Sequence, residues 1–171
     1  ALPELKGMYK NFTHRPSVRV FEGVAGLEQA MMETLQTQEK IVRAFTSTEN
    51  ILTLMSGSIK EWIVNRIQNK IRARVIYVDN ELSHVFNSSE FLLSTGFKPS
   101  NLYLEAVYLP RENYPFPVDM IIWDNSVGYL IVEGTTITTI ILEGKEVGIM
   151  TKNMFDMAFE QAKFNGTYEE S

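Results

Sequence analysis

PVDMIIWDNSVGYLI, residues 117–131, is the stretch of sequence that decides the fold. Two apolar runs, 118–123 and 127–132, flank polar turn residues, and this arrangement predicts a β-hairpin with a two-residue turn at Asn125-Ser126. One face of that hairpin then carries Asp119, Ile121, Trp123, Gly128, Leu130 and Val132. Both faces are largely apolar, so each must be covered. The hairpin is therefore predicted to lie in the middle layer of an α/β sandwich.

The rest of the chain supplies further strands and the outer layers. Strand and helix patterns alternate in the first half, which favours parallel strands joined by right-handed crossovers. The elements expected there are strands at 17–21, 40–45 and 74–78 and helices at 24–35 and 49–70. The second half adds a helix at 81–93, strands at 103–109 and 137–142, and a last helix from residue 145. The predicted fold is α/β, with helices on both faces of a mixed central sheet that has a parallel first half and an antiparallel hairpin in its second half.

Composition excludes several classes of function. The chain has 171 residues, enough for one domain, and no apolar run approaches the length of a transmembrane helix. It has no cysteine, which rules out disulfides and thiolate chemistry. The net charge is -5, and this argues against direct nucleic-acid binding. The first residues lack the profile of a signal peptide, so we expect a cytoplasmic protein that does not bind membranes.

Side chains suited to catalysis or metal binding are sparse. The two histidines, His14 and His84, have no partner at metal-ligand spacing, and we expect neither a metal site nor a cofactor. Several methionines on apolar helical stripes are predicted to fill the core, with a Met-rich partner groove as the alternative. These are Met31, Met150, Met154 and Met157. The nearest approach to a basic surface is the set Lys60, Arg66, Lys70, Arg72 and Arg74.

The hairpin resembles the phospholipase D superfamily, in which the motif His-x-Lys-x4-Asp stands just before such a turn. When the two are matched on Asp124, Pro117 takes the position of the His and Asp119 that of the Lys. Proline has no side chain that can attack phosphorus, and a carboxylate at the Lys position repels phosphate. The resemblance therefore implies a phospholipase-D-like sandwich without catalytic residues. Asp124 is also an ordinary residue for a hairpin turn.

Most of the chain resembles the effector domains of TrmB-like transcription regulators. The resemblance is carried by the order and spacing of the segments PSVRVFEG (16–23), AFTS (44–47), YLP (108–110), FPVD (116–119), IILEGKE (140–146) and MFDMAF (154–159). It implies a stub of a linker helix at 1–13, an effector-sensing and dimerisation domain at 14–166, and a frayed tail at 167–171. It also implies a homodimer, DNA binding only through an N-terminal winged helix-turn-helix domain outside this sequence, and a sugar as one class of effector.

The effector is expected at the carboxyl ends of the parallel strands. The candidate ligand-binding residues are Thr46, Ser47, Thr48, Asp79 and Asp119. Helix capping is the alternative for the three hydroxyl residues, and a solvent-facing strand start is the alternative for Asp119.

Two other functions stay open at this point. The first is a ligand-free dimerisation module, whose interface would use Trp62, Trp123 and the apolar faces of the helices. The second, less favoured because the acid-base inventory is poor, is a divergent phosphodiesterase-type enzyme. A closed, polar-lined pocket at the strand ends would separate the sensor from the dimerisation module.

Overall fold

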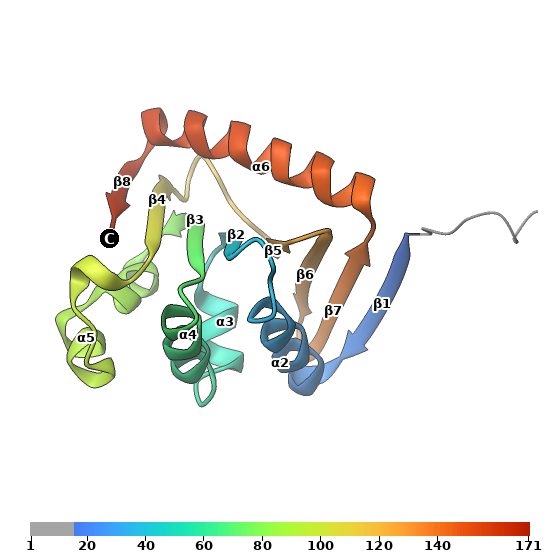
Figure 1. Cartoon of the computed structure of the whole chain (residues 1–171), viewed down its shortest axis with the longest axis horizontal. Helices are drawn as coiled ribbons and strands as arrows, with labels where there is room; N and C mark the ends of the chain where they lie inside the picture. Colours follow the sequence, from blue (N-terminus) through green and yellow to red (C-terminus); the bar gives the residue numbers. More distant parts are fainter. Residues whose placement is uncertain (1–15) are drawn as a thin grey trace, which may run out of the picture.

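The computed structural model describes residues 16–171, in which one eight-stranded sheet runs through the whole domain (Figure 1). The predicted helical stub at 1–13 lies outside the described residues. The strands are β1 (Ser17–Glu22), β2 (Ile41–Thr46), β3 (Arg72–Asp79), β4 (Leu104–Pro110), β5 (Asp119–Trp123), β6 (Ser126–Glu133), β7 (Thr136–Glu143) and β8 (Thr167–Glu170). The helices are α2 (Gly23–Thr34), α3 (Glu49–Leu54), α4 (Ile59–Gln68), α5 (Ser89–Thr95) and α6 (Lys145–Asn165), with short 3-10 turns η1 (Glu81–Asn87) and η2 (Pro99–Asn101).

The sheet is mixed, as predicted. Its strand order is β1-β7-β6-β5-β2-β3-β4-β8. Strands β2, β3 and β4 are parallel neighbours, and every other pairing is antiparallel. Strand β1 pairs with β7 at one edge rather than joining the parallel group beside β2. The parallel group is therefore built from the second, third and fourth strands of the chain.

The hairpin of β5 and β6 has the two faces that the sequence predicts. Asp119 lies opposite Leu130, and Ile121 lies opposite Gly128. The turn comes one residue earlier than predicted, at Asp124-Asn125, with Asp124 at a positive φ of 45°. An aspartate tolerates this left-handed conformation better than most residues do. A one-residue shift of a two-residue turn moves each cross-strand partner by two, so the same side chains stay on the same faces.

Helices cover both faces of the sheet, which confirms the predicted sandwich (Figure 1). The long helix α6 crosses one face, and α2, α3 and α4 lie on the other. The core accordingly has two parts. The cluster on the α2–α4 side includes Leu27, Ile59 and Trp62, whereas the cluster under α6 includes Phe155 and Phe159.

Three segments differ from the sequence prediction. The helix expected at 49–70 is interrupted between α3 and α4, because Ser56, Gly57 and Ser58 are poor helix formers. The helix expected at 81–93 is divided into η1 and α5. The tail expected to be frayed at 167–171 instead contains β8, which pairs with β4.

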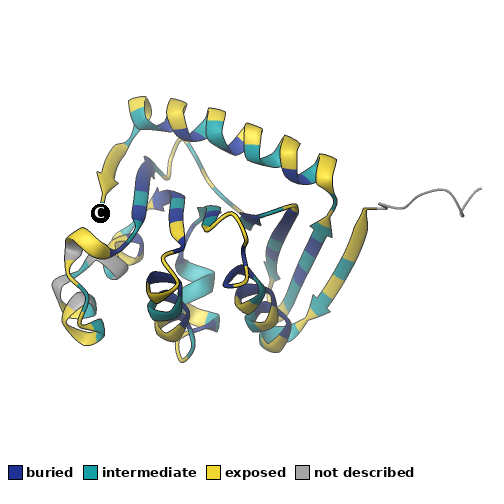
Figure 2. Cartoon of the chain, viewed as in Figure 1, coloured by how far each residue is buried: buried dark blue, intermediate teal, exposed yellow. Residues whose placement is uncertain are grey.

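The inward side of α6 was predicted wrongly. Its buried residues are Gly148, Phe155, Phe159 and Ala162, whereas Met150, Met154 and Met157 are 60%, 59% and 74% exposed. The helix carries two apolar stripes, and the one with the aromatic rings packs against the sheet. Figure 2 shows the exposed outer side of α6. Met31 is buried, as predicted. Within residues 16–171, no helix combines the length and apolarity needed to cross a membrane.

Candidate functional site

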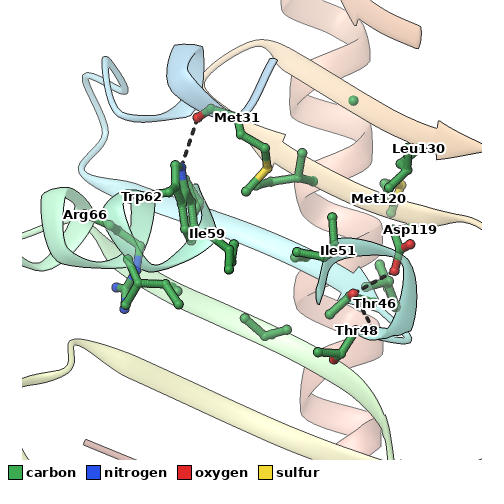
Figure 3. Close-up of a pocket in the computed structure, with 18 of the residues that line it drawn as sticks. Met31, Thr46, Thr48, Ile51, Ile59, Trp62, Arg66, Asp119, Met120 and Leu130 are labelled. Carbon is green, nitrogen blue, oxygen red and sulfur yellow. Dashed lines mark hydrogen bonds between the residues drawn. The ribbon is translucent and has the colours of Figure 1, made fainter. Parts of the chain in front are cut away.

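A cavity of about 120 Å³ lies between the sheet and helices α2, α3 and α4 (Figure 3). Its wall is mainly apolar, which differs from the polar-lined pocket expected for a sensor from the sequence. Helices α2, α3 and α4 contribute side chains that include Met31, Ile51 and Ile59, and the strands contribute Ala44, Val75 and Leu130. Ala44 and Gly128, which have little or no side chain, also line it. The space therefore suits a compact apolar group.

Asp119 stands at one end of this cavity. Its carboxylate accepts hydrogen bonds from the Thr46 hydroxyl at 2.6 Å and the Ser47 amide at 2.9 Å. The side-chain amide of Asn50 donates to its second oxygen at 3.3 Å. The residue is only 5% exposed. The alternative of a solvent-facing strand start is therefore wrong for Asp119.

Thr48 lies beside this carboxylate, at the start of α3. Its backbone φ is 72°, and its side chain makes no capping hydrogen bond. Its amide instead donates to the Thr46 hydroxyl oxygen at 2.9 Å. The Thr48 hydroxyl is buried and has no hydrogen-bond partner within residues 16–171. Helix capping therefore does not explain Thr48, and a β-branched residue at positive φ is strained.

Thr139 is a polar residue of the cavity that sequence analysis missed. It lies on β7 opposite Leu130, and Leu130 lies opposite Asp119 on β5. Because neighbouring strands are about 4.8 Å apart, Thr139 stands roughly 10 Å from Asp119 along the same face. Its hydroxyl is buried and has no hydrogen-bond partner in the described part of the chain. In the sequence it is one of several threonines in a strand, which gives no sign of this role.

Asp79 is not part of the cavity. It ends β3 at the same edge of the parallel strands, but its side chain is half-exposed and pairs with His84 Nε2 at 2.8 Å. Four of the five predicted ligand-binding residues are thus brought together. Thr46, Thr48 and Asp119 line the cavity, and the Ser47 amide holds the Asp119 carboxylate.

The other end of the cavity has polar groups that are already bonded to the backbone. The Trp62 indole N–H donates to the Met31 carbonyl at 3.0 Å. The guanidinium of Arg66 is buried and donates to the carbonyls of Ile71, Leu102 and Tyr103. Burial lowers the pKa of Arg66 to about 10. Both Trp62 and Trp123 are buried, so the prediction that they contribute to a dimerisation interface is wrong.

Asp124 has a structural role. Its carboxylate accepts hydrogen bonds from the Thr37 hydroxyl at 2.7 Å and from the amides of Gln38 and Glu39 at 3.0 and 3.1 Å. Burial raises the pKa of this carboxyl, but the Thr37 hydroxyl, the two amides and nearby Lys152 together outweigh it, so the pKa lies below its usual range. The hairpin turn is thereby tied to the loop that precedes β2.

We expect Asp124→Ala to lower the free energy of unfolding by about 2 kcal/mol at neutral pH, because a hydroxyl and two amides lose their acceptor. The folded-state pKa of Asp124 is lower than the unfolded one, so its stabilisation is present above about pH 4 and is lost as the pH falls through the folded pKa. Urea unfolding at several pH values measures both effects. Asp124→Asn keeps an acceptor and should lose less stability, with a flatter acid dependence. An acid dependence as steep in Asp124→Asn as in the wild type would contradict this role.

The remaining position of the phospholipase D motif is also accounted for. Pro117, at the position of the His, is exposed and precedes β5. Asp119, at the position of the Lys, is held by the groups described above. Among residues 16–171, no group of three or more His, Asp or Glu side chains is arranged to hold a metal ion.

Comparison with known proteins gives a fold and no family. No family model matches the sequence, and no curated protein matches it. Solved structures do match. TrmBL2, an archaeal chromatin protein described as showing a novel mode of DNA binding, aligns with a TM-score of 0.57 and 14% identity over 94% of this chain and 58% of its own. The phosphatidylserine synthase of Haemophilus influenzae Rd KW20 aligns with a TM-score of 0.60 and 10% identity over 92% of this chain and 41% of its own.

These likenesses agree with the predicted architecture. The domain has the phospholipase-D-like α/β fold, and a TrmB-like protein is among the structures that share it. The chain spans 58% of TrmBL2 and 41% of the synthase.

Proposed function

We propose that this chain is the effector-sensing domain of a TrmB-like transcription regulator and that a small molecule binds in the cavity beneath α3 and α4. The observation that carries the proposal is that Thr48 and Thr139, two residues that line the apolar cavity, have buried hydroxyls without a hydrogen-bond partner among residues 16–171. Buried polar groups are nearly always bonded, so two unpartnered groups in one cavity favour a ligand. The likeness to TrmBL2 supports the regulatory context.

DNA contact is assigned in this proposal to a separate domain. The net charge of -5 is unfavourable for a surface that approaches phosphates. A winged helix-turn-helix domain outside these residues would contact the operator, and the cavity ligand would set its geometry. A phosphodiesterase is less favoured, because Pro117 and Asp119 stand where the nucleophile and the phosphate-binding lysine are required.

Filling the cavity tests the sensor proposal. A panel of small alcohols, amines, aromatic compounds and sugars is screened by thermal unfolding, and we expect at least one compound to raise Tm by roughly 5 to 10 °C at a hundred times its Kd. Ala44→Leu places three extra carbons at the floor of the cavity and should abolish that shift without loss of stability. Ala25→Leu, on the exposed side of α2, is the matched control. No shift with any compound, or an equal shift in Ala44→Leu, contradicts the proposal.

We also propose that the domain forms a homodimer through the outer face of α6. Met150, Met154 and Met157 are exposed at spacings of four and three residues, and Phe164 continues the stripe one heptad later. Such spacing is that of a helix–helix seam, and this stripe extends over about 21 Å. A contact of this stripe with its own copy would be isologous, which is the commonest arrangement in dimers.

If the dimer forms through α6, a single charge introduced into the methionine stripe should dissociate it. Met154→Glu places a carboxylate near the centre of the stripe, and at micromolar concentration we expect the mass from light scattering to fall from that of a dimer to that of a monomer. Leu93→Glu alters an apolar residue on α5 that is even more exposed than Met154, and it should leave the mass unchanged. A monomeric wild-type protein, or a dimer that survives Met154→Glu, would contradict the α6 interface.

A further inference from the structure

We infer that the cavity ligand is a compact apolar molecule with a single hydrogen-bond-donating head group, a hydroxyl or a protonated amine, that is bound by Asp119 and Thr48. The inference rests on the proposed function, since it names the chemistry of the same effector. The head group lies at the Asp119 end of the cavity, and the apolar body extends past Ile51 and Ile59 toward Trp62 (Figure 3).

The carboxylate of Asp119 has room for one more donor. A carboxylate offers about four acceptor positions. Two are taken on Oδ1 by Thr46 and Ser47, whereas Oδ2 accepts only the long bond of 3.3 Å from Asn50. No cation forms an ion pair with Asp119 anywhere in residues 16–171. A buried carboxylate without a cation favours a donor and repels an anionic head group.

The Thr48 hydroxyl completes the head-group site. The Thr48 amide and the Asp119 carboxylate contact the same Thr46 oxygen, at 2.9 and 2.6 Å, which places the two residues around one point. Figure 3 shows Thr46, Thr48 and Asp119 together at one end of the cavity. Thr48 is 1% exposed, and its hydroxyl has no partner among the residues that the structure describes. A ligand hydroxyl can donate to Asp119 and accept from Thr48 at the same time.

The rest of the wall favours an apolar body over a sugar. Thr139 is 2% exposed and offers one further free hydroxyl, two strands away from Asp119. At the far end, the donors of Trp62 and Arg66 are already bonded to backbone carbonyls. A sugar would leave several of its hydroxyls unpaired among Met31, Ile51 and Ile59.

The size of the cavity limits the ligand. Apolar cavities of about 150 Å³ in other proteins admit benzene, so the space of about 120 Å³ here suits a molecule of roughly six to eight non-hydrogen atoms. Six-carbon chains with one terminal group are therefore suitable probes, because they differ only in the head group.

The experiment compares 1-hexanol, 1-hexylamine, hexanoate and benzene by calorimetric titration at neutral pH. We expect the alcohol and the amine to bind the wild type at least tenfold more tightly than hexanoate. In Asp119→Asn the affinity for hexylamine should fall at least tenfold. The ratio of the affinities for hexanol and hexanoate should then fall to about threefold. Thr48→Val, which keeps the shape and removes the hydroxyl, should weaken hexanol about fivefold and stay folded.

The outcomes separate the two proposals. If all four probes, including benzene, bind with similar affinity and Ala44→Leu abolishes binding, the cavity is a ligand site but the donor head group is wrong. If hexanoate binds most tightly, the head-group assignment is also overturned. If no probe binds and the wider panel raises no Tm, the proposed function itself fails. If the alcohol and the amine still bind more tightly than hexanoate by the same factor in both Asp119→Asn and Thr48→Val, these residues do not select the head group.

Discussion

Replacement of Arg66 by methionine is expected to lower the free energy of unfolding by about 3 kcal/mol. The guanidinium is buried beneath α4 and donates to the Ile71 carbonyl at 2.7 Å, the Leu102 carbonyl at 2.8 Å and the Tyr103 carbonyl at 3.1 Å. Methionine fills much of the same volume but donates nothing. The Tyr103 carbonyl also accepts from the Ala73 amide at 2.8 Å, so the cost falls mainly on the carbonyls of Ile71 and Leu102.

The bonds made by Arg66 also fix an unusual stretch of backbone. Tyr103 and Lys70 both have positive φ angles, of 51° and 54°, and they precede β4 and β3 closely. One cation therefore positions the starts of two neighbouring parallel strands. Lysine keeps the charge but cannot present several donors in a fixed plane, so Arg66→Lys should recover only part of the loss.

Urea unfolding at neutral pH, followed by circular dichroism, measures this effect. The control is Arg111→Met, which removes an arginine whose ion pair with Glu49 is on the surface and should leave the midpoint unchanged. If the Arg66→Met midpoint matched that of Arg111→Met, the buried guanidinium would contribute nothing to stability, and the account of these two strand starts would be wrong.

Gly148→Ala is expected to destabilise the domain by about 2 to 3 kcal/mol. A Cβ atom at this position would lie 2.5 Å from the Cα of Asn125 and 3.1 Å from the Asp124 carbonyl oxygen. These are backbone atoms of the β5–β6 turn, so no side-chain rotation relieves the clash. The first turn of α6 would have to move away from the hairpin, and the Gly144 amide would lose its bond of 2.9 Å to the Asn125 carbonyl.

Gly57→Ala provides the matched control for this prediction. A Cβ atom on Gly57 would have no atom within 4 Å, and its φ is not in the left-handed region. The same change should therefore be neutral or slightly stabilising, because alanine has less backbone freedom in the unfolded chain. Thermal unfolding of the two variants gives the comparison. Equal Tm values would mean that α6 is not in close contact with the hairpin turn.

Much of the fold could be predicted from periodicity. The hairpin pattern predicted the correct faces even though it placed the turn one residue late. A one-residue shift of the turn moves each cross-strand partner by two residues, and side chains alternate between faces with a period of two. The alternation of strands and helices predicted parallel neighbours, but it could not show that β1 leaves them and pairs with β7. Pairing between distant segments is set by packing of the whole sheet, which no local pattern contains.

The candidate site was predicted in part, for a similar reason. Thr46 and Thr48 follow from the rule that parallel strands end at one edge of a sheet, whereas Asp119 follows from its place in the phospholipase D motif. Asp79 satisfies the same rule but pairs with His84 at the surface. Thr139 could not be identified, because its importance depends on strands β5, β6 and β7 lying in register. Arg66 has the sequence context of an exposed helical arginine, but it is buried and donates to three backbone carbonyls that no sequence pattern brings together.

Helix α6 gives a second example of what periodicity leaves undecided. A helix with apolar residues at two sets of positions, as in α6, has a periodicity that fits either side inward. The choice was made by Phe155 and Phe159, whose rings stack at 5.6 Å between centroids, while Phe155 also packs edge-on against Phe45 at 5.1 Å. Relative side-chain size and aromatic geometry, rather than spacing, decided which stripe became core.

Strand β8 has a consequence for how the molecule avoids self-association through its sheet. Strand β4 is largely buried and apolar, and an open edge there would be a template for the addition of strands from other molecules. The last residues of the chain occupy that edge, and every residue of β8 is exposed. The paired segment includes Glu169 and Glu170, whose charges oppose stacking of a further strand. Strand β8 thus protects the edge of β4 against aggregation, and a chain truncated before residue 167 would expose the unpaired backbone groups of β4.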